Sequence, residues 1–122
     1  MTTTSSRQPI DKQLVLAKAF FNVTEQLNFT QTQIATILGI SESAISQLKI
    51  EFKIDPTSQQ GEIALSIIRL FKLLDSLSGG DLDWIRHFLN SKNQVTGGVP
   101  IKQIETACGL VSIFQFIEAI LR

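Results

Sequence analysis

Few side chains in this 122-residue chain belong to the types that carry catalysis. His87 is the only histidine and Cys108 the only cysteine, and neither is accompanied by residues that would complete a nucleophile–base pair. We interpret His87 as a surface or supporting residue. Cys108 lies near the start of an expected helix and precedes an apolar run, so we expect it to pack. This scarcity of candidate nucleophiles and bases argues against an enzyme.

Asp81 and Asp83 have the spacing of a carboxylate pair. Their position before an apolar segment favours another role, capping a short helix and compensating its dipole. The glycine pairs at 79–80 and 97–98 lack the pattern of a phosphate-binding loop. No His/Cys cluster has metal-ligand spacing. The sequence therefore predicts no metal and no cofactor, and its function must depend on binding surfaces.

The composition predicts a folded, cytoplasmic protein. Hydrophobic residues make up 43% of the chain and charged residues 18%, with 11 basic and 11 acidic side chains. A single cysteine cannot form an intrachain disulfide and suits a reducing compartment. Residues 1–9 are Thr/Ser-rich, are expected to be disordered, and lack the apolar core of a signal peptide. No apolar run approaches the ~18 residues of a membrane span.

The strongest local pattern is a helix-turn-helix. Thr30 and Gln33 form a capping box that begins one helix, and Gly39 suits its left-handed end. Ser41 follows at once and caps the next helix, over residues 42–52. The two helices therefore meet through a turn of about three residues. With a first helix over 11–27, the apolar residues expected to face inward are Leu16, Ala17, Phe20, Val23, Leu27, Ile34, Ala35, Leu38, Ile40, Ile45 and Leu48.

The second half of the chain predicts two unusually apolar helices. Pro56 and residues 58–61 are interpreted as a linker, followed by helices over 62–77 and 107–121. Each of these helices has only a narrow polar stripe, whereas a helix packed on one neighbour needs an apolar face of only ~100° or slightly more. We therefore expect burial on more than one side, including against another chain.

The segment between these helices has the features of a compact connection. Asp81 can cap a short helix that carries the only tryptophan, Trp84. Glycines 97–98 interrupt helical structure, and Pro100 suits the first position of a new helical turn. Thr106 begins the last helix. The predicted fold is all-α, an N-terminal helix-turn-helix bundle followed by a small helical module.

Helix 42–52 is the expected DNA-reading element. Gln47 suits adenine, Glu42 suits cytosine, and the serines adapt to either. The alternative is a hairpin used only for packing, which would explain why the chain has no net positive charge. A symmetric dimer that reads two half-sites would compensate for weak monomer binding. The DNA-binding candidates are Gln31, placed for a phosphate, with Glu42, Ser43, Ser46, Gln47, Lys49 and Lys53.

The chain resembles a family of bacterial type II antitoxins. Residues 11–53 look like an Xre-type helix-turn-helix, and residues 62–122 resemble the Xre/MbcA/ParS-like toxin-binding domain. We accordingly divide the chain into an Xre-like domain over 10–57 and a toxin-binding and dimerisation domain over 62–122. The matching motifs are Leu70-x-x-Leu73-Leu74, Gly79-Gly80-Asp81, Trp84 with Leu89, Gly97-Gly98-x-Pro100 and Thr106-x-x-Gly109.

The resemblance implies a cytoplasmic, homodimeric antitoxin that binds a cognate toxin and represses its own operon. That toxin is most often a RES-domain enzyme that degrades NAD, with an ADP-ribosylating toxin as the alternative. In some members the C-terminal end of the antitoxin reaches the toxin's active site, which points here to Glu118, Leu121 and Arg122. This sequence departs from the family in having PIKQI at 100–104 rather than a leucine-rich stretch, and a less basic recognition helix.

Three further residues have two interpretations each. We interpret Trp84 as a core residue, with a place on the toxin-binding surface as the alternative. Arg69 and Lys72 are most simply solvated side chains of a polar stripe, and an acidic partner or a nucleotide site is the sharper alternative. The competing function for the whole chain is a transcriptional regulator whose C-terminal helices only dimerise.

Overall fold

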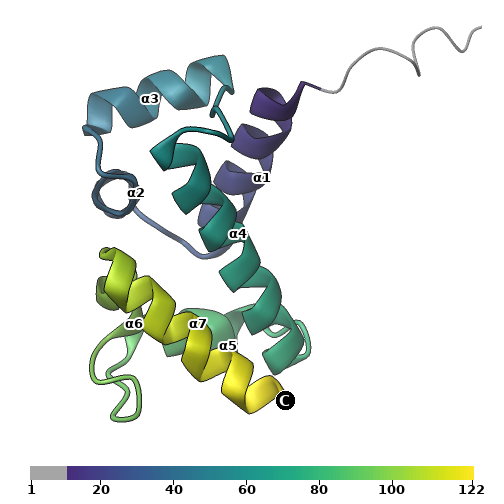
Figure 1. Ribbon diagram of the computed structural model, residues 1–122, viewed down its shortest axis with the longest axis vertical. Coiled ribbons are helices and arrows are strands. Elements are labelled where there is room, and N and C mark those ends of the chain that lie inside the picture. Colours follow the sequence, from purple (N-terminus) through teal and green to yellow (C-terminus); the bar gives the residue numbers. More distant parts are fainter. Residues whose placement is uncertain (1–10) are drawn as a thin grey trace, which may run out of the picture.

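The computed structural model describes residues 11–122, so the disorder expected for residues 1–9 lies outside the described residues. The chain is all-α, as predicted (Figure 1). The one β-type pairing among the described residues is an isolated bridge between Asn93 and Gly98. The helices are α1 (Lys12–Gln26), α2 (Gln31–Leu38), α3 (Glu42–Glu51), α4 (Gln59–Ser78), α5 (Leu82–Asn90), α6 (Pro100–Gln103) and α7 (Ala107–Leu121).

Local capping explains where these helices begin and end. The Thr30 hydroxyl accepts from the Gln33 N–H at 3.1 Å, and the Gln33 side chain accepts from the Thr30 N–H at 2.8 Å. Gly39 ends α2 with a φ of 70°, and the Ser41 hydroxyl accepts from the Ala44 N–H at the start of α3. The predicted capping box, left-handed turn and second cap are all confirmed. Asp81 and Thr106 cap α5 and α7, also as predicted.

The linker predicted at residues 56–61 is wrong in its second half. Helix α4 begins at Gln59, because the Ser58 hydroxyl accepts from the Gly61 N–H at 3.0 Å and caps it. Gly61 therefore lies in the first turn of the helix, buried against the backbone of Asp55. Because glycine has no side chain, Gly61 permits this close packing, and it does not interrupt the helix.

The turn that joins α3 to α4 is ordered by Asp55. Its Oδ1 accepts from the Thr57 N–H at 2.9 Å and from the Thr57 hydroxyl at 2.7 Å. Both hydrogen bonds stabilise the carboxylate and lower the pKa of Asp55. The bond from the Thr57 N–H has the larger effect, and the bond from the Thr57 hydroxyl has the smaller one. A lowered folded-state pKa means that this stabilisation is present above the unfolded pKa and is lost as the pH falls through the folded value.

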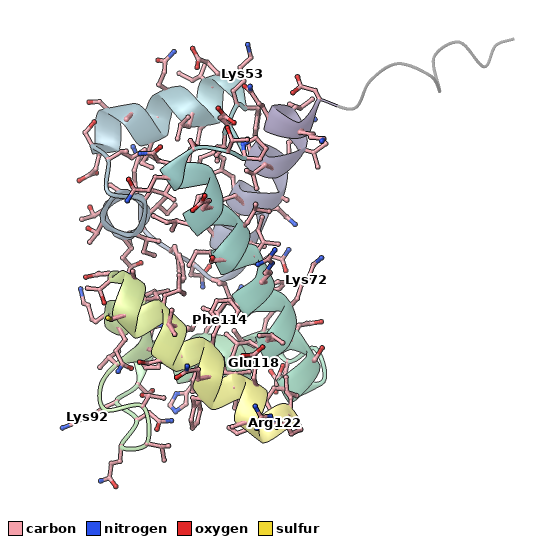
Figure 2. All side chains as sticks on the ribbon, in the orientation of Figure 1. Lys53, Lys72, Lys92, Phe114, Glu118 and Arg122 are labelled. Carbon is pink, nitrogen blue, oxygen red and sulfur yellow. The ribbon has the colours of Figure 1, made fainter. Side chains whose placement is uncertain are left out.

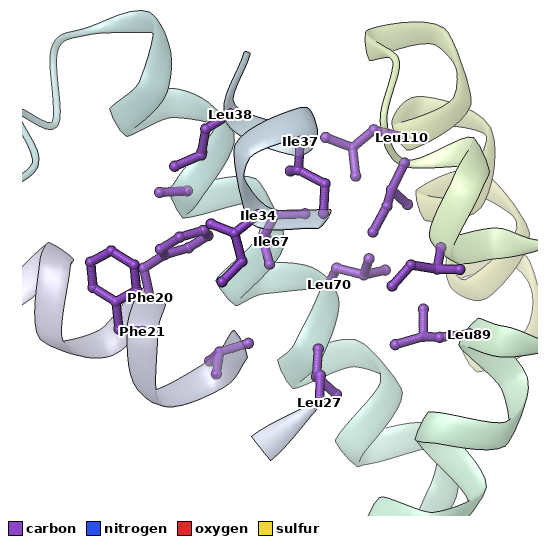
Figure 3. Packing of buried hydrophobic residues seen from close by; sticks show 14 of the residues in the cluster. Phe20, Phe21, Leu27, Ile34, Ile37, Leu38, Ile67, Leu70, Leu89 and Leu110 are labelled. Atoms are coloured by element: carbon purple, nitrogen blue, oxygen red, sulfur yellow. The ribbon is translucent and has the colours of Figure 1, made fainter. Parts of the chain in front are cut away.

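Helix α4 is the central element of the core. It packs against α1 and α2 on one side and against α5 and α7 on the other (Figures 1 and 3). Ile67 and Leu70 lie fully buried between these two groups, and Ile37 and Leu110 approach from either side. All belong to one continuous hydrophobic cluster. The helix-turn-helix half and the C-terminal half therefore share a single core.

Most residues expected to face inward do so. Leu16, Ala17, Phe20, Val23 and Leu27 are all buried. In the helix-turn-helix, Ile34, Ala35, Leu38 and Ile45 are buried, whereas Ile40 and Leu48 are only half-buried at the edge of α3. No helix formed by residues 11–122 has the length and apolar character needed to cross a bilayer.

Candidate DNA-binding and partner-binding surfaces

Helix α3 lies across one end of the molecule (Figure 1). Ile45 is its only buried residue, so most of its surface is open to a ligand. Glu42, Ser43, Ser46 and Gln47 are all exposed, as a DNA-reading helix requires. The geometry is that of a helix-turn-helix whose second helix can enter a major groove.

Gln31 braces α3 from the neighbouring helix α2. Its Nε2 donates to the Glu42 carbonyl at 2.9 Å and to the Ser46 hydroxyl at 2.7 Å. The Thr32 hydroxyl donates a further hydrogen bond of 3.1 Å to the Glu42 carboxylate. The Gln31 amide donor is therefore engaged inside the motif, and a phosphate contact would compete with these bonds. Sequence spacing did not reveal this bracing role, because it depends on how α2 and α3 cross.

The second half of α3 differs from the expected pattern. Gln47 donates from Nε2 to the Glu51 carboxylate at 2.8 Å. The Lys49 ammonium lies over the Phe21 ring of α1, and Lys53 follows the end of α3 as an exposed cation. Ile50 is 76% exposed. Ile50 was not among the residues predicted to bind DNA, although its spacing from Ser46 and Gln47 places it near them on the helix surface.

A second candidate surface lies on α7, whose C-terminal end is at the opposite end of the molecule from α3 (Figure 2). Val111, Ile120 and Leu121 remain exposed, which agrees with the expectation that this helix has more apolar surface than the chain buries. Leu121 joins Leu73, Glu118 and Arg122 around a shallow hollow. The structure thus brings together the three C-terminal residues that the resemblance selected, two on α7 and Arg122 just after it.

Trp84 lies on the surface and not in the core, so the core interpretation is wrong. It is 39% exposed, because it lies on the outer side of the amphipathic helix α5, whose Ile85 and Leu89 are fully buried. Its ring stacks on Phe88 with a centroid distance of 5.5 Å, and Phe88 stacks on Phe116 of α7 at 6.1 Å. The three rings border a hollow that also contains Ile120. Phe88 and Phe116 were not selected from the sequence.

The remaining candidates are scattered. Arg69 and Lys72 are exposed on α4 and line neither the Trp84 hollow nor the Leu121 hollow. His87 is exposed, in agreement with a surface role, with a ring nitrogen 3.4 Å from the Ser91 hydroxyl. Cys108 is exposed, so its predicted packing is wrong. It lies in the first turn of α7, on the side of the helix away from the buried Leu110 and Ile113.

The fold and the first surface define a helix-turn-helix protein of the DNA-binding type. The family model of the antitoxin Xre-like helix-turn-helix domain matches residues 6–69, more than half of the chain, and the chain belongs to this family. The match includes α1 to α3 and continues into α4. Members are typically non-enzymatic DNA-binding proteins. No curated protein matches the chain.

Proposed function

We propose that this protein is the antitoxin of a type II toxin–antitoxin system. It binds operator DNA through α3 and a cognate toxin of the RES-domain, NAD-degrading type through its C-terminal helices. The observation that supports this most strongly is the combination of an antitoxin-type helix-turn-helix at one end with an uncovered apolar helix at the other. As an Xre/MbcA/ParS-type protein, it would use residues 62–122 for both toxin binding and dimerisation.

Inhibition works by occupancy and needs no covalent step. Helix α7 packs on α4 and buries Ile113 and Ile117, while Leu121 remains available to a partner. Charged side chains of Glu118 and Arg122 surround it, so an apolar anchor is combined with polar contacts that set orientation. A toxin whose active-site entrance accepts this end of α7 would lose access to its substrate.

The operator role depends on dimerisation. With a net charge of zero, one copy gains little from phosphate neutralisation. Two copies that place their α3 helices about one DNA turn apart would bind two half-sites at once. Repression of its own operon follows, because a protein seated on the operator excludes the polymerase.

The toxin-binding role predicts a specific rescue result. If this chain is an antitoxin, its gene lies beside the gene of its toxin. We expect cells that express this neighbouring gene alone to stop growing, and co-expression of the wild-type chain to restore growth. Leu121→Asp places a charge at the apolar anchor, so we expect growth rescue to be lost and toxin affinity to fall about 30-fold or more. Pull-down of the neighbouring gene product measures the second effect directly.

The matched control is Val95→Asp, which makes the same kind of change at a residue that is 78% exposed in the loop before α6. We expect this variant to rescue growth like the wild type, and circular dichroism to show that both variants fold. The antitoxin proposal is rejected if the product of the neighbouring gene is harmless, or if it stays toxic when the wild-type chain is co-expressed. The helix-turn-helix regulator whose C-terminal helices only dimerise would then remain.

The DNA-binding role predicts the loss of an operator mobility shift. The double variant Ser43→Ala/Gln47→Ala removes hydrogen-bonding groups from the exposed side of α3, and each good base contact is worth ~1–3 kcal/mol of discrimination. Ser112→Ala/Gln115→Ala removes the same groups from exposed positions of α7 and should leave the shift intact. An unchanged shift for the α3 variant contradicts the assignment of α3 as the reading helix.

A further inference from the structure

We propose that α1 is a second DNA-contacting element and that Lys18 of α1 and Lys49 of α3 each bind a backbone phosphate. We call Lys18 and Lys49 the lysine seam. The inference rests on the proposed DNA binding through α3 and identifies which cations take part. It concerns contact with the sugar–phosphate backbone, which positions a protein on DNA irrespective of sequence.

The two lysines are held by a crossed pair of aromatic contacts between α1 and α3. The Lys18 ammonium of α1 lies 5.9 Å from the ring centroid of Phe52, the residue that ends α3. The Lys49 ammonium of α3 lies 5.7 Å from the ring centroid of Phe21 on α1. Each lysine thus reaches across to an aromatic ring of the other helix. Both ammonium groups therefore lie along the line where the two helices meet.

The backbone fixes this junction. The Ile54 N–H, just after α3, donates to the Gln13 carbonyl in the first turn of α1 at 3.2 Å. Phe21 of α1 and Ile54, two residues after Phe52, are both buried, so the chain that follows α3 is anchored to α1. The positions of the two cations are consequently set by packed structure, while the charged groups themselves stay exposed.

The charges of the seam are available to a ligand. The ion pairs among residues 11–122 are Arg86 with Asp83 and Lys102 with Glu105, so neither seam lysine lies within 4.0 Å of a carboxylate in the described part of the chain. The carboxylate of Glu51 at the end of α3 accepts the Gln47 amide instead. Lys53 adds a third exposed cation beyond α3. Three exposed cations, Lys18, Lys49 and Lys53, therefore lie on or beside the reading helix of a chain with no net charge.

The position of the seam favours a DNA phosphate as its ligand. A helix that lies in the major groove is flanked by the two phosphate backbones, so cations beside it meet phosphates while its outer face meets bases. Lysine binds phosphate as a point charge and needs no rigid geometry. Gln31, at the other end of the motif, is already occupied by bonds to α3. The seam is therefore the part of the motif best suited to supply electrostatic affinity.

The test is the salt dependence of binding to a labelled DNA duplex of arbitrary sequence, followed by fluorescence anisotropy with the full chain. Each phosphate contact contributes about −0.9 to the slope of log K against log salt concentration. We expect Lys18→Gln to reduce the slope by about 0.9 for each protomer bound, and Lys18→Gln/Lys49→Gln by about 1.8. Lys18→Arg keeps the charge and should keep the slope.

The matched control is Lys92→Gln, which removes the same charge from an exposed lysine at the opposite end of the molecule from Lys53 (Figure 2). Its slope should equal that of the wild type. A merely structural role for Lys18 would weaken binding equally at every salt concentration, and this outcome would overturn the inference. So would a Lys18→Gln slope equal to that of Lys92→Gln while the wild type binds well. Absence of any wild-type binding would instead refute the proposed DNA binding itself.

Discussion

Replacing Gly61 with alanine is expected to lower the free energy of unfolding by about 3 kcal/mol. An added Cβ would overlap the carbonyl oxygen of Asp55 and would lie 2.8 Å from the Cα of Pro56. Both neighbours are backbone atoms, so no side chain can rotate away. The first turn of α4 would have to separate from the turn after α3, and the helix that carries the core would move with it.

The sign of the change in unfolding free energy distinguishes the close packing at Gly61 from the effect of helix propensity. Alanine in place of glycine inside an ordinary helix stabilises it by up to ~1 kcal/mol, because alanine has the higher helix propensity. Gly98→Ala is the control, since the atom nearest to its added Cβ is in the Gln103 side chain at 3.4 Å, an ordinary van der Waals contact. Urea denaturation followed by circular dichroism measures both variants. A Gly61→Ala protein as stable as the wild type would contradict the close packing of α4 against Asp55.

The features predicted correctly from the sequence are those set by neighbouring residues. A capping box such as Thr30 with Gln33 is formed by side chains three positions apart, so it is visible before the chain is folded. The left-handed end of α2 at Gly39 follows from local backbone sterics in the same way. Helical periodicity also identified the buried face of α1.

The features that were missed depend on elements distant in sequence. Ser58 and Gly61 read as a linker because glycine usually interrupts a helix, whereas here the approach of Asp55 requires it. Trp84 was interpreted as a core residue because a tryptophan is more often in the core than on a binding surface, but α5 buries its opposite side. The bracing of α3 by Gln31 spans 11 positions along the chain, and only the crossing of α2 and α3 reveals it.

The candidate surfaces also combine features set within one helix with features formed between helices. The exposure of the first residues of α3 follows from the helix-turn-helix pattern itself. The lysine seam and the Trp84–Phe88–Phe116 stack are formed between helices, so no spacing rule within one helix selects Lys18 or Phe116. Apolar excess in α7 could be read from the sequence, but which of its residues stay uncovered could not.

Ile67→Ala is expected to destabilise both halves of the molecule together, by about 2–5 kcal/mol. Ile67 is fully buried at the centre of α4, where the helix-turn-helix half meets the C-terminal half (Figure 3). Truncation would leave a cavity in the cluster that both halves share. Circular dichroism reports on all helices, whereas fluorescence of Trp84, the only tryptophan, reports on the C-terminal half. The two transitions should coincide and shift to lower urea by the same amount.

Ile50→Ala is the matched control, because it removes the same atoms from a side chain that is 76% exposed and should change stability by no more than about 0.5 kcal/mol. If Ile67→Ala instead separated the two transitions, the halves would unfold independently. Helix α4 would then be a rigid connection between two modules with separate cores. A single shifted transition means that any ligand which stabilises the C-terminal half also stabilises the folded state that presents α3, since binding shifts one common unfolding equilibrium.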